Sequence, residues 1–112
     1  MPDLAGDEVA VDEVMTVAKA GAIIIDVRKR DQYMSRHIPG AVSVTLEDLE
    51  QGVPREIEAL RDRPVIVYCN TGRQRSVEAK ELLELAGFRS VMNLVGGIRA
   101  WMDAGYSLAY GP

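Results

Sequence analysis

The chain has 112 residues, 47% of them hydrophobic and 27% charged, which suits one globular domain with one core. Its formal net charge of −4 argues against a nucleic-acid-binding protein, which normally carries a basic excess. No apolar run approaches the roughly 20 residues of a membrane-spanning helix, and the acidic residues 1–8 do not read as a secretory signal. One cysteine can form no internal disulfide, so we expect a single cytoplasmic domain over residues 1–112 that contacts neither membrane nor nucleic acid.

In the first half of the chain, short apolar segments alternate with polar ones that begin or end helices. Residues 22–27 form a nearly continuous apolar run rich in isoleucine, which is typical of a central strand covered on both faces. The other expected elements are a strand at 9–11, a helix capped by Asp12 and stopped by Gly21, a short helix at 31–34, a turn at 38–40, a strand at 42–44, a helix capped by Thr45 and ended by Gly52, and a helix at 54–60.

The second half repeats the alternation. We expect a buried strand at 64–68, the longest helix at 75–86 with Gly87 after it, a strand at 90–95, and a last helix around Trp101 that stops at Gly105. Strands that alternate with helices predict an α/β fold with a mostly parallel central sheet and helices on both faces. Ligands of such sheets bind beyond the carboxyl ends of the strands. Cys69 follows one predicted strand there, and Asp26 and Arg28 lie near the end of another.

Cys69 stands between a buried strand and a short loop that leads into the longest helix. The unpaired N–H groups of a helix N-terminus favour thiolate over thiol, and the thiolate is the nucleophile. Gly72 gives residues 70–74 the freedom to curl, so that successive backbone N–H groups can form a nest for an anion. Arg73 and Arg75 add positive charge nearby. The pattern therefore predicts a nucleophilic cysteine in an anion-binding loop.

Each candidate also has a plainer interpretation. A lone cysteine is usually a small buried hydrophobe, but the electropositive loop favours a reactive thiol here. His37, the only histidine, could pair with Cys69, although a structural hydrogen bond is favoured. Asp26 in its apolar strand is interpreted first as the partner of a nearby arginine and second as a general acid. Without a second Cys/His cluster we expect no zinc site, no other metal and no cofactor.

Four ordered segments stand out and together span nearly the whole chain. They are Ile25-Asp26-Val27-Arg28; Tyr33 with His37-Ile38-Pro39-Gly40-Ala41; Val67-Tyr68-Cys69-Asn70-Thr71-Gly72-Arg73; and Leu94-Val95-Gly96-Gly97 with Ala100-Trp101 and Gly105-Tyr106. These segments resemble the single-domain rhodaneses, the sulfurtransferase family, and the loop is most similar to that of small bacterial phage-shock rhodaneses. Their order makes the resemblance far more specific than any one of them.

The resemblance implies a rhodanese-like fold and a two-step sulfur relay. Cys69 would take sulfur from a donor such as thiosulfate, form a persulfide, and pass the sulfur to cyanide or a thiol. Carried over to this chain, the family's loop runs from Cys69 to Gln74. The expected substrate-binding residues are Asn70, Thr71, Gly72, Arg73, Gln74 and Arg75. We expect small-molecule partners and a monomer.

Two departures keep alternatives open. Arg36 stands where many relatives have glycine, which places a charge either at the pocket or in solvent. Cys69, five residues, Arg75 and Ser76 also match the signature of cysteine phosphatases, and the same fold is shared by some phosphatases and arsenate reductases. If Arg75 belongs to the loop, the pocket suits phosphate or arsenate; if Arg75 begins the helix, the loop is the shorter sulfurtransferase kind. A non-catalytic, rhodanese-like binding module is the third alternative.

Overall fold

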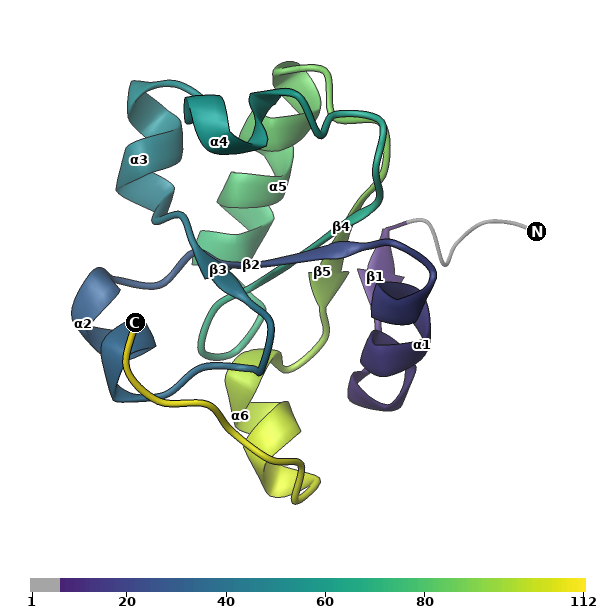
Figure 1. Ribbon diagram of the computed structural model, residues 1–112, viewed down its shortest axis with the longest axis vertical. Helices are drawn as coiled ribbons and strands as arrows, with labels where there is room; N and C mark the ends of the chain where they lie inside the picture. Colours follow the sequence, from purple (N-terminus) through teal and green to yellow (C-terminus); the bar gives the residue numbers. More distant parts are fainter. Residues whose placement is uncertain (1–6) are drawn as a thin grey trace.

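The computed structural model describes residues 7–112, so the first six residues of the expected domain lie outside the described part. Its centre is a five-stranded sheet in the order β1-β5-β4-β2-β3, in which all strand pairs are parallel. The strands are β1 (Glu8–Val9), β2 (Ile23–Asp26), β3 (Val42–Ser43), β4 (Val65–Tyr68) and β5 (Val91–Leu94). Figure 1 shows the sheet crossing the molecule between two layers of helices.

Helices cover both faces of the sheet, which confirms the predicted α/β class. Three of them pack on one face: α3 (Leu46–Gln51), α4 (Arg55–Glu58) and α5 (Arg75–Leu85). The other face is covered by α1 (Val14–Lys19) and α6 (Gly97–Asp103) (Figure 1). Helix α2 (Arg30–Ser35) connects β2 to β3, and the C-terminal segment ends beside it, where the Gly111 N–H donates to the Met34 carbonyl over 2.8 Å.

The alternation of side chains along β4 decides which face receives the cysteine. Val65 and Val67 point into the core beneath α3, α4 and α5, whereas Ile66 and Tyr68 point into the core beside α1 and α6. All four are fully buried, as expected for a central parallel strand. Because successive side chains alternate, Cys69 falls on the same face as Val65 and Val67 and packs among residues of the first core.

The expected caps in the middle of the chain are present. Thr45 accepts a hydrogen bond from the Asp48 N–H at 3.0 Å, while the Asp48 carboxylate accepts one from the Thr45 N–H at 3.1 Å, and Gly52 ends α3 at a φ of 129°. The helix expected at 54–60 is regular only over Arg55–Glu58, with the following residues in turns.

The N-terminal prediction was partly wrong. The strand covers Glu8–Val9 instead of residues 9–11, and a 3₁₀ turn, η2 (Val11–Glu13), precedes α1. Glu13, not Asp12, closes this turn: its carboxylate accepts the Ala10 N–H at 2.9 Å, and its N–H donates to the Ala10 carbonyl at 2.9 Å. Over residues 7–112, no helix is long and apolar enough to cross a membrane.

Candidate active site around Cys69

Cys69 lies at the carboxyl edge of the sheet, in the loop between β4 and α5. The whole residue is 4% exposed, so the sulfur is almost entirely enclosed by the protein. The Gly72 N–H donates to Sγ over 3.2 Å, and the Ser76 Oγ lies 3.2 Å from Sγ. When the sulfur is a thiol, its S–H donates to the Ser76 hydroxyl; when it is a thiolate, the hydroxyl can rotate and donate to the sulfur.

The environment of the sulfur favours the thiolate. Burial acts to raise the pKa of the Cys69 thiol, but hydrogen bonds from the Ser76 hydroxyl and from the N–H groups of Ser76, Gly72 and Thr71 outweigh burial and hold the pKa below its usual value. Most of these donors are backbone groups fixed by the loop and by the start of α5. They are therefore in place before a negative charge forms on the sulfur.

The curl of the loop depends on Gly72. Its φ is +77°, and a Cβ there would lie 2.6 Å from the Leu94 carbonyl oxygen, so a side chain is excluded by both conformation and space. The Asn93 side-chain amide donates to the Gly72 carbonyl at 2.8 Å. The end of β5 thus fixes the middle of the loop, with the Gly72 N–H directed at the sulfur.

A second contact holds the start of the loop from the side of α6. Gly97 has a φ of +61°, and a Cβ there would collide with the Cys69 carbonyl oxygen and lie 2.6 Å from the carbonyl carbon of Asn70. This close approach lets the Ile98 N–H donate to the Cys69 carbonyl at 2.9 Å and the Arg99 N–H to the Asn70 carbonyl at 3.1 Å. Because the carbonyls of Cys69 and Asn70 point toward α6, the N–H groups of the loop can point toward the sulfur.

A buried network beneath the loop connects it to β2. The register pairs Asp26 with Tyr68, whose hydroxyl donates to the Asp26 carboxylate at 2.7 Å and accepts the Ile38 N–H at 3.0 Å. The Arg28 guanidinium donates to the same carboxylate at 2.8 Å and reaches the Asn70 Oδ1 at 3.4 Å. Burial and the neighbouring Asp26 raise the pKa of Tyr68, so it acts as a neutral donor. Asp26 is therefore the partner of an arginine, as expected.

Arg75 is the first residue of α5, and its side chain is bound elsewhere than at the sulfur. Its Nε and Nη2 donate to the Val27 carbonyl at 3.2 and 2.8 Å. Its Nη1 and Nη2 also form a two-pronged ion pair with Glu47 of α3, at 2.9 and 2.8 Å. The hydrogen bonds from Arg75 lower the pKa of Glu47 to about 2. Of the alternatives left open by the sequence, the structure has Arg75 begin the helix.

The remaining candidates in the loop and near the turn at residues 38–40 lie around this centre. Thr71, Arg73 and Gln74 are exposed in the loop that follows Cys69. Arg36 is exposed, with its Nη1 3.7 Å from the Met102 sulfur, and it helps line a cleft of about 250 Å³ next to Asn70. Arg36 thus borders a cleft on the α6 side of the loop.

His37 has a structural role on the other face of the sheet. It is buried, its Nδ1 lies 2.9 Å from the Tyr33 carbonyl, and its ring stacks on that of Tyr33 with centroids 3.9 Å apart. Its backbone exchanges two hydrogen bonds with Ala109, at 2.9 and 2.8 Å. Since Tyr33 packs in the core beside α1 and α6, and Cys69 packs beneath α3 and α5, the geometry favours the structural interpretation of His37.

Comparison with known proteins identifies the family. The Rhodanese-like domain family matches residues 10–104, which include Cys69 and the loop that follows it. The chain belongs to the rhodanese family. A crystal structure of the Alr3790 protein from Anabaena superposes on this rhodanese with a TM-score of 0.78 at 30% identity, covering 91% of this chain and 80% of that one.

Two curated relatives carry functional names. This rhodanese is 34% identical over 85 residues to a thiosulfate sulfurtransferase GlpE of Coxiella burnetii, covering 76% of each chain. It is 39% identical over 75 residues to the thiosulfate sulfurtransferase PspE of Escherichia coli, covering 67% of this chain and 69% of that one. The family match at residues 10–104 includes Cys69 and its loop as part of the whole domain, so the roles of single residues are argued from the geometry above.

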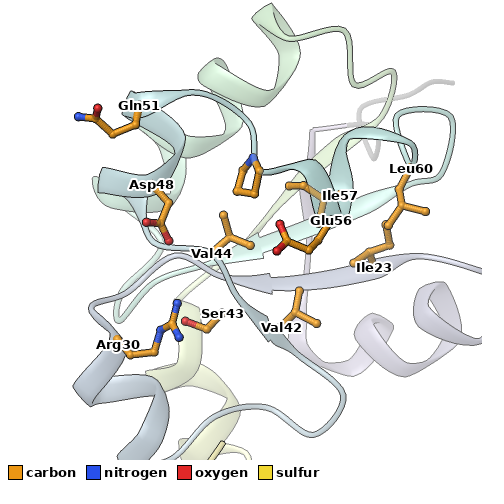
Figure 2. A pocket seen from close by; sticks show the side chains of 11 residues that line it. Ile23, Arg30, Val42, Ser43, Val44, Asp48, Gln51, Glu56, Ile57 and Leu60 are labelled. Carbon is orange, nitrogen blue, oxygen red and sulfur yellow. The ribbon is translucent and has the colours of Figure 1, made fainter.

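A second cavity of this rhodanese lies away from the sulfur. It measures about 650 Å³ and is bounded by β3, α3 and α4, with Arg30, Asp48 and Glu56 around apolar side chains such as Val44 and Ile57 (Figure 2). Cys69 does not line it. Helix α3 therefore separates two environments, with Asp48 directed toward the cavity and Glu47 toward Arg75. Within residues 7–112, no cluster of three or more His, Cys, Asp or Glu side chains could hold a metal ion.

Sequence reasoning missed three residues that shape the site. Ser76 was noted only as part of a signature, yet its hydroxyl contacts the sulfur; its position in the first turn of the helix after the loop was the available signal. Gly97 was read as a family marker, while its lack of a side chain is what admits the Cys69 carbonyl. Glu47 gave no signal, because its contact with Arg75 joins residues 28 positions apart.

Proposed function

We propose that this rhodanese is a thiosulfate sulfurtransferase in which Cys69 is the nucleophile. The observation that carries the proposal is the sulfur itself, which is buried within a curl of N–H donors and beside the Ser76 hydroxyl. Such a cradle favours a sulfur anion in the resting enzyme and again after a second sulfur has been added. The relatives named as thiosulfate sulfurtransferases support this assignment.

The proposed reaction has two displacements and needs no cofactor. The Cys69 thiolate attacks the outer sulfur of thiosulfate; an S–S bond forms to Cys69, the S–S bond of thiosulfate breaks, and sulfite leaves with the electron pair. Cyanide or a thiolate then attacks the outer sulfur of the persulfide, thiocyanate or a new persulfide leaves, and the Cys69 thiolate returns. Atoms and electrons balance in both steps, and the enzyme alternates between two covalent forms.

The loop residues have distinct proposed roles. The N–H groups of Thr71, Gly72 and Ser76 stabilise the sulfur anion. Arg73 is exposed within the loop and offers a cation to the departing sulfite group. Asn70 anchors the loop through its carbonyl and its contact with Arg28. For Gln74, which directly precedes α5, and for Arg75, the sequence expectation of substrate contact stays a prediction.

Intact-mass spectrometry tests the proposal directly. After treatment with thiosulfate, the wild-type protein should gain one sulfur atom, and subsequent cyanide should remove it and yield thiocyanate. The Cys69→Ser variant should neither gain mass nor form thiocyanate, and sulfite, which lacks a transferable sulfur, should leave the wild type unchanged. Thiocyanate formation that persists in Cys69→Ser would refute the role of this cysteine.

The two rival functions predict other outcomes. A phosphatase or arsenate reductase, favoured by the spacing of Cys69, Arg75 and Ser76, should hydrolyse aryl phosphates or reduce arsenate in a manner that depends on both Cys69 and Arg75. A non-catalytic binding module should hold a thiol that resists iodoacetamide at neutral pH. A cytoplasmic location and a monomeric state also stay predictions; size-exclusion chromatography with light scattering measures the second.

A further inference from the structure

The position of Arg75 raises the question of what keeps it from the anion site. Four hydrogen bonds hold its guanidinium, two to the Val27 carbonyl and two to Glu47, which occupies four of the five N–H groups of the side chain. Val27 directly follows β2 and Glu47 lies in the first turn of α3. The arginine is therefore fixed between two neighbouring elements of the fold and turned toward them.

The restraint depends on Glu47 more than on the carbonyl. A two-pronged pair between a guanidinium and a carboxylate is stronger and more directional than a bond to a neutral oxygen. The lowered pKa of Glu47, about 2, means that it stays ionised at any pH near neutrality. However, 56% of the Glu47 side chain and 26% of the Arg75 side chain are exposed, so water competes for both groups. Once the charge of Glu47 is removed, the Arg75 guanidinium is therefore free to move.

A released Arg75 would lie beside the sulfur. It directly precedes Ser76, whose hydroxyl and N–H both contact the Cys69 sulfur, and the charge of Cys69 already acts on the Arg75 guanidinium. A guanidinium matches the geometry of two oxygens of phosphate or arsenate, whereas a sulfur anion on Cys69 is already served by the N–H groups of the loop. The same loop would then suit a tetrahedral oxyanion better than it does now.

We propose that Glu47 determines the specificity of the loop by holding Arg75 away from Cys69, which keeps the site suited to a sulfur anion and poor at binding phosphate or arsenate. Glu47 acts through Arg75 and touches no substrate, so it is a positioning residue. The inference deepens the proposed sulfurtransferase function, since it concerns which anion the same loop accepts.

Inorganic phosphate is the probe for this inference. Cys69 is alkylated with iodoacetamide at fixed pH and ionic strength while the phosphate concentration rises, and the half-protecting concentration is measured. In Glu47→Gln, which keeps the shape and removes the charge, this concentration should fall about threefold to fivefold, a gain of about 0.6–1 kcal/mol in binding. Isothermal titration calorimetry with phosphate provides the same comparison without using the reactivity of the thiol.

Two matched variants separate the release of Arg75 from a general change of charge. Glu50 lies on the same helix, is exposed, and acts on Arg75 only through its charge, so Glu50→Gln should bind phosphate like the wild type. The double variant Glu47→Gln, Arg75→Gln should lose the gain. An unchanged half-protecting concentration in Glu47→Gln, an equal gain in Glu50→Gln, or a gain that survives in the double variant would each overturn the inference.

Failure of the inference and failure of the proposed function look different. If thiosulfate adds no sulfur to wild-type Cys69 but Glu47→Gln binds phosphate more tightly, the sulfurtransferase assignment is wrong and the role of Glu47 stands. If thiosulfate does add sulfur and phosphate binding does not change, the enzyme assignment stands and Glu47 has no part in specificity. Melting temperatures close to that of the wild type show that the variants are folded.

Discussion

Two arginine–carboxylate pairs lie on either side of the Cys69 loop, and they differ in burial and in their effect on the loop. Asp26 and Arg28 have side chains that are 0% and 4% exposed, and they connect β2, Tyr68 and Asn70 in one network. Glu47 and Arg75 are 56% and 26% exposed and connect α3 to the start of α5. The comparison teaches that the buried pair Asp26–Arg28 stabilises the loop through Asn70, while the half-exposed pair Glu47–Arg75 determines which anion the loop binds.

The largest difference should appear when one carboxylate of each pair is neutralised. Asp26→Asn leaves the buried charge of Arg28 without its counter-ion, which should lower the free energy of unfolding by about 3–5 kcal/mol. Urea denaturation of the variant and the wild type measures this loss. A loss below about 1 kcal/mol would mean that the buried pair is no more important to the fold than an exposed one.

A smaller effect should separate hydrogen bonding from charge within the buried pair. Tyr68→Phe keeps both ions but removes the hydroxyl that donates to Asp26 and accepts the Ile38 N–H. Because a buried N–H then lacks a partner, the free energy of unfolding should fall by about 1–3 kcal/mol. The same urea series provides the measurement, and a loss as large as that of Asp26→Asn would assign the stability of the network to the hydroxyl.

The smallest effect belongs to the exposed pair. The pKa of Glu47 in the folded protein, about 2, lies below the usual value of about 4.3 for an unfolded chain, so the pair stabilises the fold above pH 4 and that contribution disappears as the pH falls from 4 toward 2. Glu47→Gln should cost about 0–1 kcal/mol at pH 7 and nothing at pH 2. Thermal unfolding at both pH values tests this, and a pH-independent cost would contradict an ion-pair origin.

Much of this fold could be predicted from the sequence because local signals agreed with the tertiary structure. The apolar run before Cys69 became a fully buried strand, and Thr45 became a cap that exchanges hydrogen bonds with Asp48. The start of the chain was less predictable, since a two-residue strand and a 3₁₀ turn carry little pattern. There, Glu13 closes a turn that precedes the helix, and Asp12 does not cap that helix as expected.

In the candidate site, the sequence could place Cys69 at the start of its loop, but it could not give the direction in which the neighbouring side chains point. Cys69 and Gly72 follow from a strand, a loop and a helix in succession. The side chain of Arg75 could not be placed, because its partners, Val27 and Glu47, lie in segments that only the order of the sheet brings next to the loop. Spacing from Cys69 alone therefore could not separate a sulfur site from a phosphate site.

The contact between α6 and the loop also makes the arrangement around Cys69 depend on residues that are synthesised after it. The carbonyls of Cys69 and Asn70 are held by Ile98 and Arg99, which the ribosome adds about thirty residues later. The last strand, β5, lies between β4 and β1, so β1 can pair with the sheet only after β5 has been synthesised. A chain that contains Cys69 and all of α5 but not α6 therefore still lacks the N–H groups that hold the carbonyls of the Cys69 loop.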